Sequence, residues 1–168
     1  MNRILAFVLV SMCLHAVATA EPTTLVEWKF ERDGDLEGWT QRNHVQELRV
    51  EQGALCGRIM DWDPFVRSPQ FQIAATPYQR VELRIKTDCG GSGDLFWTNT
   101  TESKYGGFSP GKQTPFQVIG DGAWHEYHVY PFWHKEQKIV LLRVDFPRPS
   151  ESDFGEKTFA IDSIRVVD

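Results

Sequence analysis

The stretch that decides the fold class is Val81-Glu82-Leu83-Arg84-Ile85-Lys86, in which apolar and charged residues alternate strictly. A period of two is that of a β-strand, whose successive side chains point to opposite faces. The three apolar side chains are therefore predicted to face a core, and Glu82, Arg84 and Lys86 to share the other face. Because that other face is charged, we expect it to meet solvent or a ligand.

Short alternating segments continue along the chain, separated by turn residues at the spacing typical of β-sandwiches. Besides 81–86, the predicted strands cover residues 25–31, 45–51, 54–60, 95–98, 116–119, 124–130, 139–146 and 158–167. No segment has convincing helical periodicity, and residues 98–115 are predicted to form a surface loop. Nine or ten strands without a helix predict an all-β fold, a two-sheet antiparallel β-sandwich of the jelly-roll type, in a single domain over residues 21–168.

The first 20 residues have the layout of a cleavable secretory signal peptide. Arg3 precedes an apolar run over residues 4–17, and small residues follow up to Ala20, where we expect cleavage. That run is too short to cross a bilayer, so no membrane insertion is predicted and the protein is expected to be secreted or periplasmic. A lipoprotein would use Cys13, but Met12 stands where the lipidation signal requires a small residue.

The charge balance limits the class of partner. The predicted signal contains one of the 18 basic residues and none of the 23 acidic ones, which leaves a net charge of −6 with His neutral. An acidic chain repels nucleic acid and anionic membranes, so no nucleic-acid partner is expected.

Two cysteines, Cys56 and Cys89, remain after the predicted cleavage, in a compartment that permits disulfides. A bridge between them would stabilise the fold by about 3–4 kcal/mol. Two separately buried thiols are an equally good interpretation.

Two patterns look catalytic at first sight. Residues 107–111 match the G-x-S-x-G motif of a hydrolase nucleophile, but Ser109 is followed by Pro110, which lacks the N–H that the oxyanion hole needs. Pro115 also prevents the helix that this motif requires. Asp61 and Asp63 could act as paired carboxylates, but acidic turn residues are a commoner explanation for them.

The remaining titratable residues do not form a recognisable catalytic set, so the chain is predicted not to be an enzyme. His125 and His128 lie three apart on a predicted strand and should face opposite ways. The alternative is a polysaccharide lyase or glycoside hydrolase that uses Glu82, Glu126 and Tyr127.

Aromatic residues are more abundant than a core of this size requires, and residues 21–168 contain all six tryptophans. Trp28, Trp39 and Trp124 are predicted to anchor the core. The aromatic residues predicted to be exposed, because they lie in or near loops or beside polar residues, are Trp62, Trp97, Tyr105 and Trp133.

Exposed rings suit sugar recognition, because the C–H-rich face of a pyranose stacks on a ring while nearby polar side chains bind its hydroxyls. Polar side chains project from the strands on the face opposite the apolar residues. The predicted ligand-binding residues are Arg84, Lys86, Trp97, Tyr105, Arg143 and Asp145. A charged face that is merely solvated is the alternative interpretation.

Four segments resemble a known family: residues 30–39, from Phe-Glu-Arg-Asp-Gly to Gly-Trp, then residues 122–127, 142–145 and 161–165. The chain resembles the galactose-binding-like β-jelly-roll domains that include many carbohydrate-binding modules, and the resemblance covers nearly all of residues 21–168. It implies a non-catalytic domain whose partner is a glycan or polysaccharide. Related jelly rolls also bind proteins, so an extracellular or envelope domain that binds a protein or has a structural role is the alternative.

The resemblance also implies a structural calcium ion. In many such modules the ion joins an acidic residue after the first strand to one in the last strand, and these positions correspond to Glu31 and Asp162. Such an ion would link the two ends of the domain, and a chelator would then lower the melting temperature.

Overall fold

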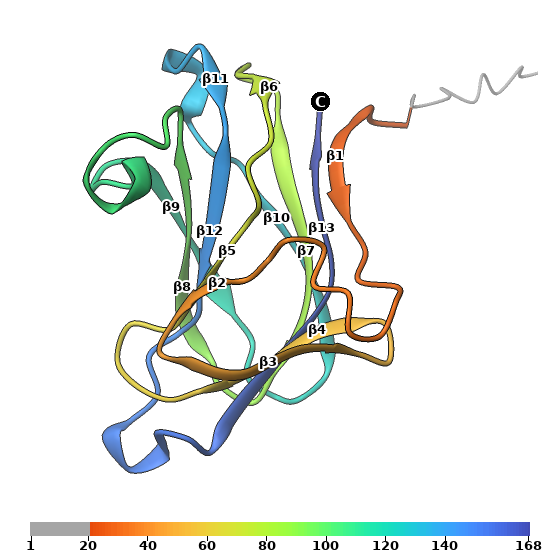
Figure 1. The fold of residues 1–168 in the computed structure, drawn as a ribbon, viewed down its shortest axis with the longest axis vertical. Coiled ribbons are helices and arrows are strands. Elements are labelled where there is room, and N and C mark those ends of the chain that lie inside the picture. The colour runs from red at the N-terminus through yellow and green to blue at the C-terminus, as the bar shows by residue number, and fades with distance from the viewer. Residues whose placement is uncertain (1–20) are drawn as a thin grey trace, which may run out of the picture.

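Residues 21–168 are described by a computed structural model, and the predicted signal peptide lies outside the described residues. The described chain forms 13 strands and three short 3-10 helices. Two main antiparallel sheets face each other across one core, which confirms the predicted all-β two-sheet sandwich (Figure 1). Among residues 21–168, no helix is long and apolar enough to cross a membrane.

The larger sheet has six strands, and β13 lies at its centre. Its first half pairs with β4, its second half pairs with β1, and β7 runs along its whole other side. The strands are β10 (Trp124–Val129), β7 (Arg80–Thr87), β13 (Lys157–Val167), β4 (Ala54–Ile59), β3 (Val45–Glu51) and β1 (Thr24–Trp28).

The alternation in β7 has the predicted effect. Val81, Leu83 and Ile85 are at most 1% exposed and belong to the core, whereas the charged residues between them lie on the outer face of the six-stranded sheet. Burial of three such side chains contributes about 1.5–3 kcal/mol each relative to full exposure.

The smaller main sheet has five strands, and β8, β9 and β12 stand on the left of Figure 1, opposite β1, β7 and β13. In order, its strands are β2 (Gln41–Asn43), β5 (Phe65–Arg67), β12 (Leu141–Asp145), β8 (Gly91–Thr98) and β9 (Gln113–Val118). A separate pair is formed by β6 (Ile73–Ala74) and β11 (Lys138–Ile139). The 3-10 helices are η1 (Lys104–Gly107), η2 (Trp133–Lys135) and η3 (Glu151–Asp153).

The core between the sheets is rich in aromatic rings. Trp28 and Trp39 are buried, as predicted, and meet edge to face with ring centroids 5.3 Å apart. Trp124 was expected to be a third anchor, and this was wrong. It lies on the outer face of the six-stranded sheet, because Tyr127 and Val129 occupy the inward positions of β10.

The chain crosses between the sheets at two glycines that touch. A Cβ atom on Gly120 would lie 2.1 Å from the backbone nitrogen of Gly90, which is far closer than real Cβ atoms approach. Only glycine fits there, so the β7–β8 and β9–β10 connections pack backbone against backbone. At this contact the chain leaves the six-stranded sheet after β7 and returns to it at β10. Strands β8 and β9, which lie between them in the sequence, belong to the five-stranded sheet.

Cys56 and Cys89 are free thiols, so the disulfide interpretation does not hold. Cys56 lies on the outer face of β4, where its Sγ is 3.5 Å from the carbonyl oxygen of Ala54. Cys89 is buried in the core beyond the end of β7, with its Sγ near the carbonyl oxygen of Pro147. Strand β13 separates β4 from β7, and burial raises the pKa of both thiols.

Candidate functional site

The outer face of the five-stranded sheet contains a cleft of about 390 Å³, within the usual size range of ligand sites. Strands β2, β5 and β12 and the 99–112 loop form it. The residues lining the cleft are Gln41, Arg42, Asn43, Asp63, Phe65, Arg67, Tyr105, Phe108 and Arg143.

Strand register explains why these side chains meet. Val66, Leu142 and Val144 point into the core, so their neighbours along β5 and β12 point outward. Two rows of outward side chains then cross the sheet. The first row is Gln41, Arg67, Arg143, Phe96 and Gln113, and the second is Asn43, Phe65, Asp145, Asp94 and Pro115.

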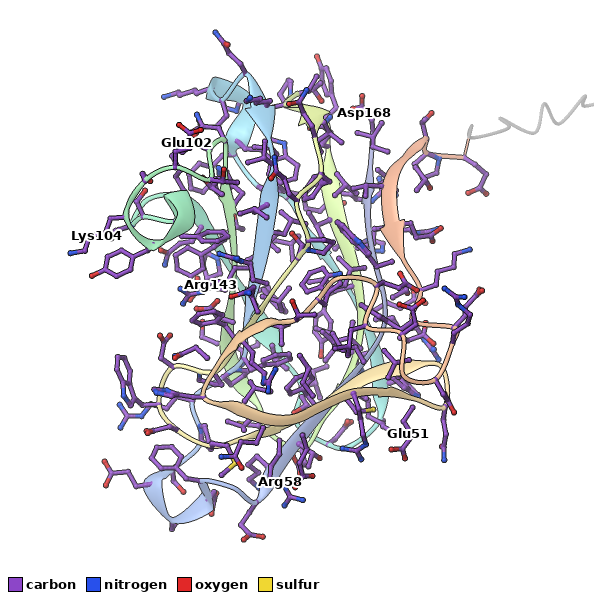
Figure 2. The ribbon with its side chains drawn as sticks, viewed as in Figure 1. Glu51, Arg58, Glu102, Lys104, Arg143 and Asp168 are labelled. Carbon is purple, nitrogen blue, oxygen red and sulfur yellow. The ribbon has the colours of Figure 1, made fainter. Side chains whose placement is uncertain are left out.

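Arg143 lies at the centre of this face (Figure 2). Its guanidinium carbon is 3.7 Å from the ring centroid of Phe65 and 4.8 Å from that of Phe96. Its Nε donates to Asp145 Oδ1 at 2.6 Å, and a terminal nitrogen donates to Asp63 Oδ1 at 3.2 Å. Stacking and hydrogen bonds together hold the guanidinium in one orientation.

Asp145 supports Arg143 from below the cleft surface. Burial raises the pKa of its carboxyl group to about 6, although the hydrogen bonds from Arg143 act in the opposite direction. Both of its oxygens accept hydrogen bonds from Arg143. The carboxylate is thus occupied with positioning the arginine.

Tyr105 borders the cleft from the 99–112 loop and is 72% exposed. Three successive residues, Tyr105, Gly106 and Gly107, have positive φ angles of 60°, 67° and 92°. A Cβ atom on Gly107 would lie 2.1 Å from Thr98 Oγ1, so this tight turn against β8 requires glycine. The turn presents the tyrosine ring, and Lys104 Nζ lies 4.7 Å from its centroid.

Phe108 anchors the same loop. It is buried in a small apolar cluster with Val140, Leu141 and the partly buried Phe96, on the outer side of the five-stranded sheet. The loop therefore closes one end of this face, and Figure 2 shows Lys104 and Glu102 on it beyond Arg143.

The opposite rim of the cleft comes from the turn before β5. Asn43 Nδ2 donates to the backbone oxygen of Asp63 at 2.7 Å and lies 3.3 Å from its carboxylate. Asp63 also accepts a hydrogen bond from Arg143. It is therefore part of the site, although the sequence indicated only an acidic turn residue. The neighbouring Trp62 is exposed, as predicted, and packs its edge against His44.

The six predicted ligand-binding residues do not form one surface. Tyr105 and Arg143 line the cleft, and Asp145 lies directly behind Arg143. Arg84 and Lys86 lie on the outer face of the other sheet, over the ring of Trp124 at 4.8 and 5.1 Å. Arg84 is also paired with Asp162 at 2.9 Å.

Trp97 lies between the two sheets and is 1% exposed, so its expected exposure was wrong. It shares an orientation with the buried Leu95 two positions earlier on β8, and its ring packs against Trp133. Trp133 was also expected to be exposed, and it is buried, with its Nε1 donating to Gln79 Oε1 at 2.9 Å.

The alternative catalytic residues Glu82, Glu126 and Tyr127 border one depression of the six-stranded sheet, although alternation points Tyr127 into the core. Tyr127 is buried, and its hydroxyl accepts a hydrogen bond from the Ile119 N–H, whereas Glu126 on the same strand is exposed to solvent. Burial alone would raise the pKa of Glu82, but hydrogen bonds from Arg165 and Arg80 hold it below its usual value. Glu82 is therefore kept ionised and paired, which does not suit a general acid.

The residues implied for calcium do not fit the ion. Glu31 and Asp162 border one hollow, which Lys29 also lines. One oxygen of Asp162 is paired with Arg84, and the other accepts from the Ser163 hydroxyl. Within residues 21–168 no group of three or more acidic, His or Cys side chains could hold a metal, whereas calcium takes six to eight oxygen ligands.

Solved structures share this arrangement of sheets. The C-terminal CBM6 of LamC, a marine laminarinase from Zobellia galactanivorans, matches with a TM-score of 0.52 and 11% identity over 82% of this chain and 98% of that chain. A mutant of CBM29-2, a family 29 carbohydrate-binding module, matches with a TM-score of 0.53 and 10% identity over 89% and 92%. The chain has the β-sandwich fold of carbohydrate-binding modules. No protein-family model and no curated protein sequence matches it.

The chain is also similar in fold to an adhesin domain. The K3 cleaved adhesin domain of Lys-gingipain from Porphyromonas gingivalis matches with a TM-score of 0.54 and 9% identity over 86% of this chain and 98% of that chain. At such low identities the comparisons establish the fold, and the function has to be argued from the cleft.

Proposed function

We propose that this chain is a secreted or periplasmic, non-catalytic carbohydrate-binding domain that holds a glycan in the cleft on the outer face of the five-stranded sheet. The observation that carries the proposal is the cleft itself, which combines the exposed ring of Tyr105 with amide and guanidinium groups along two adjacent strand rows. Its likeness in fold to two carbohydrate-binding modules supports it.

The chemistry of the cleft suits sugar hydroxyls. Gln41 and Asn43 offer donors and acceptors on the short strand β2, and Arg143 presents fixed donors between two phenyl rings. Tyr105 offers a flat surface on which a pyranose ring can stack. Hydrogen bonds already hold Arg143 and Asn43, which reduces the entropy lost when a glycan binds.

The outer face of the six-stranded sheet suits a ligand less well. Its charged groups are largely paired with one another, as in Glu82 with Arg80 and Arg165, and Arg84 with Asp162. The depression around Glu82 measures about 90 Å³, and a larger hollow of about 450 Å³ on the same face is lined by Glu47, Arg49 and Arg58, which are paired with one another. A ligand there would have to break existing ion pairs.

The non-catalytic part of the proposal is supported by the state of the acidic groups. Asp145 directs both oxygens to Arg143, and Asp63 is bonded to Arg143 and Asn43. Neither carboxylate is free to donate a proton to a glycosidic oxygen. Release of reducing sugar by the purified protein would overturn this part.

Affinity gel electrophoresis on a panel of polysaccharides tests the binding function. At least one glycan should retard the protein, and Tyr105→Ala should weaken the retardation about ten-fold, in line with the loss of one stacking contact. Tyr78→Ala is the matched control, since Tyr78 is equally exposed but does not line the cleft. Failure of every glycan to bind, or an equal loss in both variants, would contradict the proposal.

A protein-binding domain is the second candidate, and a specific observation favours it. Tyr78, Tyr130 and Phe132 are large, exposed and outside the cleft, where a glycan in the cleft would not use them. A pull-down from extracellular material with the triple Ala variant as control separates the candidates, because a protein captured only by the wild type would favour this second function.

A further inference from the structure

Arg67 differs from Arg143, its neighbour in the cleft, because no carboxylate neutralises it. Among the ion pairs within residues 21–168, Arg143 has Asp63 and Asp145 as partners, whereas none involves Arg67. The Nε atom of Arg67 is buried and has no hydrogen-bond partner. A buried donor without a partner is costly, and Arg67 therefore keeps unused hydrogen-bonding capacity beside the cleft.

The surroundings of Arg67 hold its guanidinium at the cleft surface. Its neighbours across the sheet are Gln41 on β2 and Arg143 on β12. A Cβ atom on Gly106 would lie 3.0 Å from one of its terminal nitrogens, so the glycine at this position leaves room for the guanidinium under the loop. Arg67 lines both the cleft and an adjoining hollow of about 340 Å³.

The charge of the cleft is opposite to that of the protein. Its charged lining consists of Arg42, Arg67 and Arg143 against Asp63, and with Asp145 behind Arg143 the excess is one positive charge, in a chain whose net charge is −5. Arg42 directs its donors to the backbone oxygens of Val45 and Thr40, so it has no acidic partner either. A cleft of one sign on a molecule of the other sign concentrates ligands of opposite charge.

We infer that the glycan is anionic, and that Arg67 binds its carboxylate or sulfate group. This inference rests on the proposed function of the cleft and adds the chemical class of the ligand. The planar guanidinium forms two parallel hydrogen bonds with either kind of anion through its terminal nitrogens. Arg143, already bonded to Asp63 and Asp145, serves the neutral hydroxyls.

Calorimetric titration with matched oligosaccharides tests the inference. The probes are an oligogalacturonate, its methyl ester, a sulfated carrageenan oligosaccharide and the neutral laminarihexaose. An anionic probe should bind at least about ten-fold tighter than the neutral ones, which corresponds to one charge-assisted pair. The methyl ester is the neutral control, because it lacks only the carboxylate charge, and comparison of the oligogalacturonate with the carrageenan oligosaccharide distinguishes carboxylate from sulfate.

Arg67→Gln should lower the affinity for the anionic probe to that for the neutral probes and so remove the preference. Arg148→Gln is the matched control, because it removes the same charge from an exposed arginine outside the cleft. Raising NaCl from about 50 to about 500 mM should weaken only the anionic probe. Melting temperatures of both variants report whether they are folded.

Three results would overturn the inference. Neutral probes that bind as tightly as anionic ones would contradict it while leaving the proposed function intact. An anionic preference that persists in Arg67→Gln would assign the charge recognition to other residues. Failure of all probes to bind would remove the inference together with the proposed function.

Discussion

Trp97 and Trp133 offer a paired test of where the aromatic residues lie. Both are 1% exposed, and their rings pack against each other at a centroid distance of 6.0 Å. They differ in one respect. Trp133 Nε1 donates to Gln79 Oε1, whereas Trp97 Nε1 is buried without a hydrogen-bond partner.

Replacement of either tryptophan by Phe removes two ring carbons, which costs about 0.8 kcal/mol each, or about 1.6 kcal/mol in total. For Trp133→Phe the lost hydrogen bond adds about 1 kcal/mol, which gives a destabilisation near 2.5 kcal/mol. For Trp97→Phe, removal of an unpaired buried donor returns about 1–3 kcal/mol, so the free energy of unfolding should stay near that of the wild type.

Urea denaturation of both variants measures the difference, which should be about 2–3 kcal/mol with Trp97→Phe the more stable. Glycan affinity of Trp97→Phe should equal that of the wild type, because the ring lies between the sheets and outside the cleft. A loss of affinity at unchanged stability would refute the placement of Trp97 in the core. Equal destabilisation of the two variants would refute the hydrogen-bond argument.

Burial raises the pKa of Asp145 to about 6. The contribution of Asp145 to the free energy of unfolding should therefore be highest below about pH 4 and should fall by up to about 3 kcal/mol as the pH rises through about 6. The difference in unfolding free energy between wild type and Asp145→Asn should therefore change between these pH values, and a constant difference in urea denaturation would contradict this. Because Cys56 and Cys89 are free, a reducing agent should leave the melting temperature unchanged, and a fall on addition of dithiothreitol would indicate a bridge. EDTA should also leave the melting curve unchanged, because Arg84 already pairs with Asp162, whereas a drop reversed by calcium would restore the ion that the family resemblance implied.

Alternation along strands predicted the fold well because it depends only on the order of residues. In β7, buried apolar residues alternate with charged residues. The predicted strand differs from the observed one by a single residue at each end. The same rule would have placed Trp97 correctly. Its side chain points to the same side as that of the buried Leu95, whereas the side chain of Phe96 points to the opposite side. The surplus of aromatic residues outweighed that signal.

Alternation says which face a residue takes within its sheet, but not to which sheet the strand belongs. Arg84 and Arg143 both point outward as predicted, yet they lie on opposite sides of the molecule because β7 and β12 are in different sheets. Long-range pairing of this kind depends on the whole packing of the sandwich. No local pattern contains it.

Half of the cleft comes from strands that are too short to have a detectable period. Strands β2 and β5 have three residues each, and β5 lies between Pro64 and Pro69, so Arg67 was not recognised as a strand residue. Their pairing with each other and with β12 creates the two rows of polar side chains. The site residues missed by sequence reasoning are therefore those whose position depends on tertiary structure.

Backbone chemical shifts, recorded with and without the tightest-binding glycan of the panel, test the central claim most directly. The account predicts that the shift changes concentrate on β2, β5, β12 and the 99–112 loop, with the largest at Arg67, Tyr105 and Arg143. Changes concentrated on β7, β10 and β13, on the outer face of the six-stranded sheet, would contradict it.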